Sequence, residues 1–517
     1  MAELFPCPSC GGQLIYDPES GQMKCLSCGS FFKVNEYQPQ KFDNTRQVTV
    51  CPNCGGEVAA PSLDGMQFCP YCGSEIANAG HFSEDGYPKY IIPFALSKKD
   101  CISRYQKMVH GVPFLPNDLK STEGLSSFVG LYTPYWIYDY KANGSVNAPV
   151  EKFSSDAFYD YHYTADMTVN LYCDIHLGQD ASKTLDDTVS AQIEPFFYEK
   201  LIAFHPNYMA GFYAENSTVD PSIYEDSMKE RCADMIAARI DQAASSNGSY
   251  SLCSRDNVKN RLLSCTKRAG EGNGAYLPIW FLTTRKNDRV AYTVVNGQTG
   301  AAHADLPIDI RQYLIASLLA SAVCAFVLLL LFGVFGTVDM KAVPYLTLLF
   351  SSILTMIASR QSEKIYRKEH HLDDPGYTGE RREGKKTSSP GKPKSMRTIM
   401  PLLIFIILFI VVFSMGFPDS IIKIGAVVFF AVSVISMIRR ARGSSAVTAA
   451  LSLAGSVLSL LDIAIAPYQD IFMYGLMIVN LLVLLAVAVR LTKDYNRIAT
   501  NPLPQFQKTG GRLNERY

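Results

Sequence analysis

The sequence predicts a multidomain protein that joins two tandem small zinc ribbons, a soluble α+β domain and an all-α membrane domain of about six transmembrane helices. Three observations predict this fold class: duplicated cysteine pairs near the N-terminus, mixed strand and helix patterns in the middle, and long apolar stretches in the second half. We expect the parts to span residues 1–40 and 45–80 for the ribbons, 85–311 for the α+β domain, 312–490 for the membrane domain and 491–517 for a cytosolic tail.

Eight of the 14 cysteines form two units with the same spacing. In each unit a Cys-x2-Cys pair is followed, after fourteen residues, by a second such pair, and the two units lie 44 residues apart. Two pairs of this kind can supply the four thiolates of a tetrahedral zinc site. We therefore predict two zinc ions, bound by Cys7, Cys10, Cys25 and Cys28 in the first ribbon and by Cys51, Cys54, Cys69 and Cys72 in the second.

Disulfide bonding is the alternative use of these cysteines. The repeated short spacing, with a glycine after each pair, favours metal. A ribbon of about forty residues is also too small to fold on a hydrophobic core alone, so zinc would supply most of its folding free energy. A thiolate site implies a reducing compartment, and the other six cysteines are therefore predicted to be free thiols.

The charge around the cysteines argues against nucleic acid as a partner. Residues 1–84 carry four basic and nine acidic side chains. A module that binds phosphates needs a basic surface. A nucleic-acid-binding protein tethered to the membrane stays an alternative, and we favour ribbons that contact protein or serve the structure.

An α+β pattern begins at about residue 85. Residues 97–110 and 221–244 are predicted helices, because a capping residue or a proline stands at the start and apolar residues recur on one face. Residues 128–140 and 161–175 have the patterns of strands.

Two similar apolar phrases carry the two tryptophans of the chain, Trp136 and Trp280. Each phrase leads into a polar turn and a second strand, so we expect two similar β units that stack or pair. The tryptophans could form a ligand platform, and we favour buried core positions for them.

The sequence contains no catalytic constellation. It has no phosphate-binding glycine loop, no Gly-x-Ser-x-Gly elbow and no His-Glu-x-x-His helix. His162, His176 and His205 are scattered, and Asp186 and Asp187 have the character of common surface residues. The prediction is a non-enzymatic protein.

The second half of the chain differs in charge and hydropathy from the first. The balance of charged residues is −10 up to Arg311 and +10 from Gln312 onward. Between the basic segments lie stretches long enough, as helices, to cross a hydrocarbon core. The predicted spans are residues 313–335, 343–359, 399–417, 421–438, 446–466 and 471–489.

Basic residues alternate among the predicted loops. The loop at 360–398 carries eleven, the segment 439–442 three and the tail after Val489 six, whereas the intervening loops carry only Lys341. The positive-inside rule then predicts a multi-pass protein of the cell membrane with both termini in the cytoplasm. The loop at 360–398 could bind anionic lipid or only fix the topology.

A transporter or channel with a regulatory zinc-ribbon domain is an alternative for this half. Polar groups inside a membrane mark transport pathways, and the predicted spans contain few: Lys423, Asp462 and Asn480. We therefore favour anchorage or scaffolding in the lipid bilayer.

Several phrases in the first 312 residues resemble a bacterial family of zinc-ribbon membrane proteins, labelled TFIIB-type zinc-ribbon proteins or helicase-like. They are Cys-Pro-x-Cys-Gly-Gly at 7–12 and 51–56, Ile-Pro-Phe at 92–94, Tyr-Thr-Pro-Tyr-Trp-Ile-Tyr-Asp at 132–139, Tyr-Met-Ala-Gly-Phe-Tyr-Ala-Glu at 208–215, Leu-Pro-Ile-Trp at 277–280, Asn-Gly-Gln-Thr-Gly at 296–300 and Asp-Leu-Pro at 305–307. The helicase label finds no support, because no nucleotide-binding motif is present. The duplicated ribbon and the six predicted spans depart from simpler members.

The resemblance implies a membrane adaptor in envelope stress that works with phage-shock protein A-like and flotillin-like (SPFH) proteins. The residues themselves indicate two zinc sites and a membrane-held chain. Together they predict a non-enzymatic adaptor or scaffold that recruits cytosolic or peripheral membrane proteins.

Overall fold

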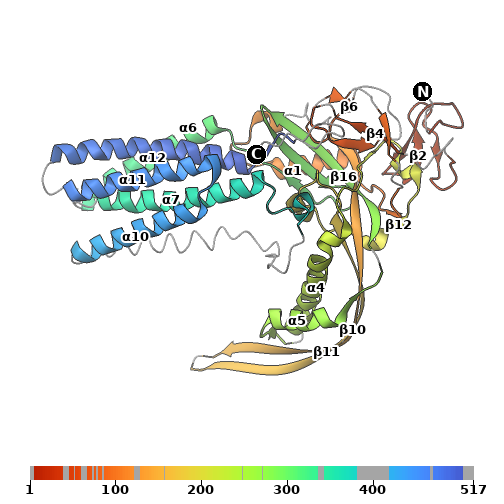
Figure 1. The fold of residues 1–517 in the computed structure, drawn as a ribbon, viewed down its shortest axis with the longest axis horizontal. Coiled ribbons are helices and arrows are strands. Elements are labelled where there is room, and N and C mark those ends of the chain that lie inside the picture. Colours follow the sequence, from red (N-terminus) through yellow and green to blue (C-terminus); the bar gives the residue numbers. More distant parts are fainter. Residues whose placement is uncertain are drawn as a thin grey trace.

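The computed structural model consists of a β-rich body, a bundle of long helices that extends from one side of the body, and a two-stranded arm that projects from it (Figure 1). The N-terminal end lies on the side of the body away from the bundle (Figure 1). The structure describes residues 5–38, 46–51, 53–59, 67–72, 75–76, 80–83, 87–120, 128–156, 158–246, 248–270, 272–335, 343–380, 419–465 and 470–504.

Most strands are short, but the three strands β10, β11 and β16 are long. The N-terminal strands are β1 (Leu14–Asp17), β2 (Gln22–Cys25), β3 (Phe31–Phe32), β4 (Arg46–Val50), β5 (Glu57–Ala59), β6 (Gln67–Phe68), β7 (Glu75–Ile76) and β8 (Gly80–Ser83). The others are β9 (Tyr90–Ile91), β10 (Val129–Ser155), β11 (Asp160–Asp180), β12 (Ile202–Ala203), β13 (Tyr213–Ala214), β14 (Ser251–Leu252), β15 (Thr266–Arg268), β16 (Asn273–Lys286), β17 (Arg289–Asn296), β18 (Ala302–Ala304) and β19 (Asn501–Pro502).

One 14-stranded sheet organises the body, with the order β12-β9-β16-β10-β13-β5-β4-β8 along its main path. The two tryptophan-containing strands, β10 and β16, pair antiparallel at its centre, with Tyr132 opposite Pro278. Trp280 is a buried core residue, and its indole N–H donates to the Leu96 carbonyl oxygen at 3.0 Å. The expected pairing of two similar β units is therefore present.

Beyond the body, β10 and β11 continue together as the arm. All of β11 pairs antiparallel with β10, from Asp180 opposite Tyr135 to Asp160 opposite Ser155. Helices α4 (Glu225–Ser246) and α5 (Arg255–Cys265) pack against the inner part of the arm (Figure 1). The strands predicted at 128–140 and 161–175 are thus much longer than expected.

The remaining helices cap the body or form the bundle. The short ones are α1 (Lys98–Val109), α2 (Asn117–Lys120), α3 (Asp187–Gln192), α8 (Pro375–Thr378), η2 (Tyr198–Lys200), η3 (Pro206–Met209), η4 (Pro221–Tyr224) and η6 (Gly443–Ser445). The bundle contains α6 (Ile310–Phe335), α7 (Val343–Glu369), α10 (Asp419–Arg440), α11 (Ala446–Ile465) and α12 (Asp470–Ile498). The predicted helix at 97–110 is α1, where Ser97 and Asp100 form a capping box.

The predicted all-α domain of about six transmembrane helices is wrong. Among the described residues, two segments are long and apolar enough to cross a membrane, Gly443–Ala464 and Tyr474–Ile498. A shorter apolar helix covers Ile310–Val323, and the predicted span 399–417 lies outside the described residues. The fold is instead dominated by the large sheet, with several helices of mixed composition beside it.

Helix α7 shows why an apolar run misled the prediction. Its apolar first half continues without a break into a charged half that ends at Glu369. Small polar residues are buried on it beside apolar ones, and Ser351 accepts hydrogen bonds from Ser452 and Ser456 of α11, each at 3.0 Å. Small hydroxyl side chains allow two helices to approach closely.

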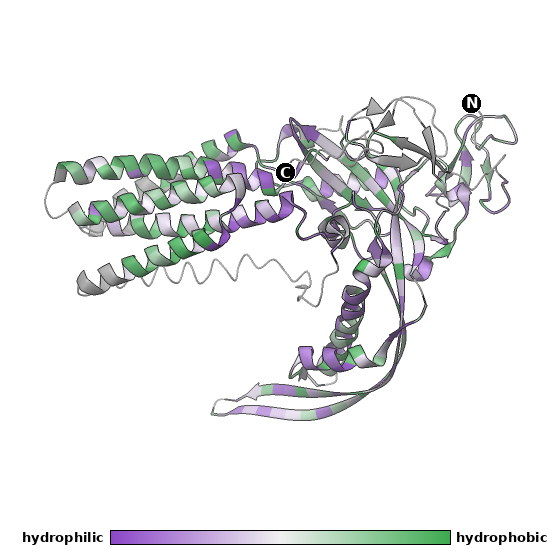
Figure 2. Cartoon of the chain, in the orientation of Figure 1, coloured by the Kyte–Doolittle hydropathy of each residue, from purple (hydrophilic) through white to green (hydrophobic). Residues whose placement is uncertain are grey.

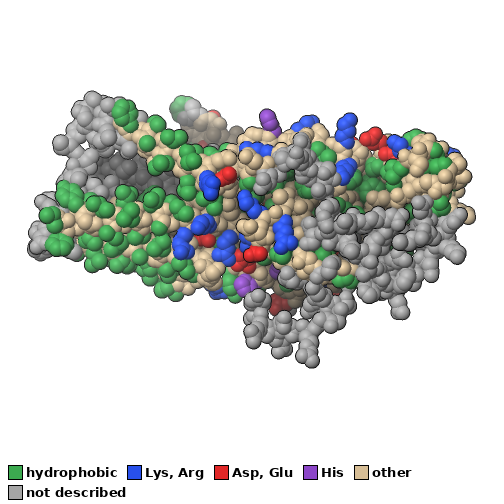
Figure 3. All heavy atoms as spheres, turned by 90° about the horizontal axis from the view of Figure 1, so that it is seen from above, with side chains coloured by type: hydrophobic (Ala, Val, Ile, Leu, Met, Phe, Trp, Pro, Cys, Tyr) green, Lys and Arg blue, Asp and Glu red, His purple; other side chains and the backbone are tan. Residues whose placement is uncertain are grey.

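The outside of the bundle is apolar (Figure 2). On α12, Leu481, Leu482 and Leu485 are all exposed. Lys and Arg side chains gather where the bundle meets the body (Figure 3). An apolar helical surface bordered by charge is typical of a protein that associates with a membrane.

Polar contacts hold the bundle to the body. Strand β19, which follows α12, pairs with β17 of the sheet. Arg289 of β17 donates to the carbonyl oxygens of Arg497 at 2.7 Å and Thr500 at 2.8 Å. Glu369, at the end of α7, accepts from Arg497 at 2.8 Å and pairs with Arg289 at 3.4 Å. The sheet, α7 and α12 therefore meet at one charged centre.

Candidate metal centres

The first cysteine cluster is built from two tight turns. Backbone hydrogen bonds close the turn at Cys7, and Cys25 is the last residue of β2. The Sγ atoms of Cys7 and Cys28 are 3.7 Å apart, and those of Cys10 and Cys25 are 3.5 Å apart. All four Sγ atoms lie within 4.8 Å of one another.

The second cluster repeats this geometry. The Sγ atoms of Cys51 and Cys72 are 3.7 Å apart, and those of Cys54 and Cys69 are 3.6 Å apart. Again, all four lie within 4.8 Å of one another. The structure thus brings together the eight cysteines in the two groups that the spacing predicted.

The donor set suits a zinc ion in both places. A tetrahedral zinc site with Zn–S bonds of about 2.3 Å has sulfur atoms roughly 3.8 Å apart, close to the separations above. Backbone N–H groups point at the sulfur atoms, for example from Gly12 to Cys10 at 3.4 Å and from Gly56 to Cys54 at 3.5 Å. In the first cluster, hydrogen bonds with Ser30 lower the pKa of Cys28, whereas contacts with the other sulfur atoms raise that of Cys10. Each cluster could therefore hold a metal ion such as zinc.

The two sites differ in their surroundings. In the first cluster Cys10 and Cys28 are exposed, whereas all four cysteines of the second cluster are buried. The spacing of the cysteines is the same in both, so this difference arises from the rest of the fold.

The first ribbon packs on the body through its inner face only. Its three strands form a sheet of their own. The Asn207 side chain holds it by donating to the carbonyl oxygens of Val34 at 2.6 Å and Tyr37 at 2.7 Å. On the outer side, Leu26 and Phe31 are exposed. This ribbon therefore displays an apolar edge and two of its cysteines to the surroundings.

The second ribbon is part of the large sheet. Ala59 of β5 pairs with Ala214 of β13, and β4 and β8 extend the sheet from there. The turn between its last two cysteines is tied to β16 and β17, because Tyr292 donates from its hydroxyl to the Tyr71 carbonyl oxygen at 2.9 Å and Thr283 donates to that of Pro70. A metal ion here would support the sheet itself.

A buried carboxyl group lies in the same region. Glu215 follows β13 and is 2% exposed, and it accepts hydrogen bonds from the hydroxyls of Ser182 and Thr184. Burial raises the pKa of Glu215 to about 7, although these hydrogen bonds act in the opposite direction. In the sequence, Glu215 stands out only as the last residue of the stretch 208–215, which resembles the zinc-ribbon membrane family.

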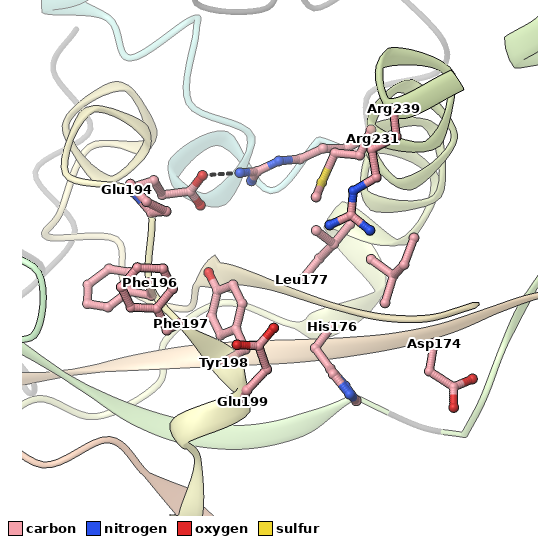
Figure 4. A pocket seen from close by; sticks show the side chains of 13 residues that line it. Asp174, His176, Leu177, Glu194, Phe196, Phe197, Tyr198, Glu199, Arg231 and Arg239 are labelled. Atoms are coloured by element: carbon pink, nitrogen blue, oxygen red, sulfur yellow. Dashed lines mark hydrogen bonds and ion pairs between the residues drawn. The ribbon is translucent and has the colours of Figure 1, made fainter. Parts of the chain in front are cut away.

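The structure also contains a charged pocket of about 280 Å³ beside the arm (Figure 4). Glu194 forms an ion pair with Arg231 of α4 across it, and Arg239 of the same helix lies beside this pair (Figure 4). His176 also lines the pocket, with its Nδ1 atom 2.6 Å from Asp139 Oδ1. The thirteen lining residues include no serine, cysteine or lysine, so none of these common nucleophiles faces it.

The chain is similar to a bacterial protein of known sequence. The chain is 27% identical to "Uncharacterized protein YdjG" of Bacillus subtilis (strain 168) over 322 residues, which are 60% of this chain and 91% of YdjG. No family model matches the chain, and no solved structure matches it. The tandem cysteine clusters fit zinc-ribbon-like sites, and membership of the zinc-ribbon membrane family stays a prediction.

The different burial of the clusters predicts different rates of metal loss. With a chelator in excess, we expect the exposed first site to release zinc at least about tenfold faster than the buried second site, because ligand exchange needs access to the sulfur atoms. Zinc release followed with a colorimetric indicator should show two phases. In Cys10→Ser the fast phase of zinc release should disappear while the slow phase stays. If both zinc ions leave the wild-type protein at the same rate, the assignment is contradicted.

Proposed function

We propose that this protein is a non-enzymatic, zinc-containing adaptor on the membrane, which recruits cytosolic or peripheral membrane proteins. The observation that carries the proposal is the arm formed by β10 and β11, whose far end exposes aromatic side chains to solvent. The exposed aromatic residues beyond the helices α4 and α5 are Phe153, Phe158, Tyr159, Tyr161 and Tyr163. Aromatic side chains supply most of the binding energy in many protein interfaces.

Hydrogen bonds to Asp156 tie together the described residues at the end of the arm. The carboxylate of Asp156 accepts from the backbone N–H groups of Phe158 and Tyr159, both at 2.9 Å, and from the Tyr161 hydroxyl at 3.0 Å. These hydrogen bonds lower the pKa of Asp156, so the carboxylate stays charged at neutral pH. A preorganised end loses little conformational entropy on binding, which supports a role in recognition.

The first ribbon supports the proposal from the other side of the body. Its exposed Leu26 and Phe31 form a second apolar edge, and it lies far from the bundle (Figure 1). An adaptor needs surfaces that reach into the cytosol while the chain is held at the membrane. With one zinc ion in each cluster, the ribbon would keep this edge rigid.

For the membrane, we propose that α11 and α12 cross as a pair and leave both termini in the cytoplasm. Arg439, Arg440 and Arg442 precede α11, and Arg490 and Arg497 lie near the end of α12. Basic residues at the same end of both helices agree with the positive-inside rule. The ribbons, the sheet and the arm would then share the reducing side, where thiolate zinc sites are stable.

Affinity purification of the full-length chain from its native membranes tests the adaptor. For the double variant Phe158→Ala/Tyr159→Ala, we expect at least about tenfold less of the co-purified partner, as for the loss of central aromatic contacts. Tyr172→Ala is the matched control, because Tyr172 is an exposed tyrosine (92%) on the same arm, away from its end. By the resemblance above, phage-shock protein A-like or SPFH proteins are the expected partners.

Both variants should keep their zinc content and membrane location, which shows that they are folded. If the double variant recovers the same partners in the same amounts as the wild-type chain, the arm does not recruit them. Cys10→Ser, assayed in parallel, separates recruitment by the first ribbon from recruitment by the arm.

A further inference from the structure

A third group of metal-ligating side chains lies where α7 leaves the bundle and returns to the body. It consists of Asp186, His371 and Asp374, whose ligand atoms all lie within 4.8 Å of one another. Asp186 comes from the loop before α3, and the other two come from the loop between α7 and α8. The group therefore joins the sheet to the end of a bundle helix, across almost two hundred residues of sequence.

Local contacts fix each of the three residues. Asp186 caps α3 by accepting from the Thr188 N–H at 2.8 Å, and Asp374 caps α8 by accepting from the Tyr377 N–H at 2.9 Å through Oδ1. The His371 ring stacks on the ring of Tyr377, with centroids 4.0 Å apart. Ligands that are already positioned lose little freedom when a cation binds.

The loop is also pressed against the body. A Cβ atom on Gly376 would lie 2.3 Å from the Tyr224 hydroxyl, so only glycine fits this approach. That hydroxyl donates to both carboxylate oxygens of Asp187, at 2.9 and 3.0 Å. The two halves of the group are therefore held together by packing that does not depend on a cation.

Asp374 carries the observation that points to a ligand. Its side chain is 2% exposed, and its Oδ2 atom has no hydrogen-bond partner in the described part of the chain. Leaving a carboxylate oxygen buried without a partner is costly.

A cavity borders the group at Asp186. The cavity has a volume of about 380 Å³, lies between the body and the bundle, and is lined by Asp186 together with His303, Asp305 and Lys368. A cation and its remaining water ligands could enter from this side.

We propose that Asp186, His371 and Asp374 form a third metal site, which binds a divalent cation such as Mn²⁺ through two carboxylates and one imidazole. Carboxylate oxygens suit Mn²⁺, and the imidazole excludes Mg²⁺ and Ca²⁺ as the preferred ions. Three protein ligands leave coordination positions for water from the cavity. The cation connects the loop after α7 to the loop before α3. Its binding therefore links the membrane bundle to the part of the chain that carries the ribbons and the arm.

The test titrates Mn²⁺ into zinc-loaded, full-length protein in detergent and counts free Mn²⁺ by electron paramagnetic resonance. Thiolate sites filled with zinc do not compete for Mn²⁺, so one bound Mn²⁺ per chain is expected. Asp374→Asn and His371→Ala should each weaken this binding at least about tenfold. Asp373→Asn is the matched control, because the neighbouring Asp373 pairs with Arg367 instead and should bind Mn²⁺ as the wild-type chain does.

Thermal unfolding gives a second readout. Mn²⁺ should raise the unfolding temperature of the wild-type chain and of Asp373→Asn, and should leave that of His371→Ala unchanged. Absence of Mn²⁺ binding to the wild-type chain, or equal loss in Asp373→Asn and Asp374→Asn, overturns the proposal. Two zinc ions retained in every variant show that the comparison is between folded proteins.

Discussion

Cys54→Ser is expected to remove one of two zinc ions and to destabilise the large sheet, whereas Cys10→Ser removes one zinc ion with much less effect on the sheet. Both residues are the second cysteine of the first pair in their unit. Cys54 is buried, and the ribbon around it supplies β4, β5 and β8 to the sheet. Cys10 is exposed, in a ribbon with a sheet of its own.

The size of the effect follows from the role of structural zinc. Such an ion contributes roughly 10 kcal/mol or more to the folding of a small ribbon. If part of this is transmitted to the sheet, about 4 kcal/mol is enough to lower its unfolding temperature by roughly 10 °C. Metal analysis measures the loss of zinc. Unfolding followed by tryptophan fluorescence measures the stability of the sheet, because Trp136 and Trp280 lie in its strands. Equal shifts in the two variants would show that the burial difference has no energetic meaning.

The second expected result concerns Glu215 and pH. Its pKa is raised to about 7 in the folded chain, against 4.5 when unfolded. Between these values the folded state binds one proton more than the unfolded state, so the contribution of Glu215 to stability falls as pH rises and is constant above about pH 7. Between pH 5.5 and 7.5 this loss is about 2 kcal/mol.

Glu215→Gln should remove this part of the pH dependence, because an amide keeps polar contacts with Ser182 and Thr184 but does not titrate. Urea unfolding of the wild-type chain and the variant at both pH values measures the difference, and other groups cancel in the comparison. Glu199→Gln, an exposed position, is the control and should keep the wild-type dependence. Parallel pH profiles for the wild-type chain and Glu215→Gln would show that Glu215 is ionised in both states.

The structure changes how the ribbons should be studied. Deletion of residues 1–80 would remove β4 and β5 and leave β8 without its partner β4, so one end of the main path of the sheet would be lost. Such a deletion cannot separate recruitment from folding. Single substitutions in the exposed first cluster can, because that ribbon is joined to the body by packing and by single hydrogen bonds, such as that from the Tyr16 N–H to the Ala210 carbonyl oxygen at 2.9 Å, and not by sheet pairing.

Local patterns in the sequence were reliable where neighbouring residues decide the structure. The spacing of Cys-x2-Cys pairs fixes which thiols can meet, and Ser97 three residues before Asp100 fixes a capping box. The alternating pattern of β11 was recognised, but its length was not. The alternation of apolar and polar residues does not indicate that β10 and β11 stay paired as an arm beyond the body.

The membrane half failed as a prediction because apolar runs were counted as separate spans. Hydropathy along the sequence does not show that α7 extends through the charged residues up to Glu369, or that Ser351 faces a serine-rich partner helix. Both depend on which helix lies alongside, and two segments in the described chain remain apolar enough to cross a membrane.

By itself, the sequence determined the two groups of four cysteines, the similarity of the two tryptophan strands and the apolar character of the second half, since these follow from spacing and composition. Only the tertiary structure decided that one cysteine cluster is buried in the sheet while the other is exposed. The same holds for Asp186, which has the character of a surface residue in sequence and meets His371 and Asp374 in space. Burial and long-range contact are properties of the packed chain, and identical local motifs take different roles because different neighbours cover them.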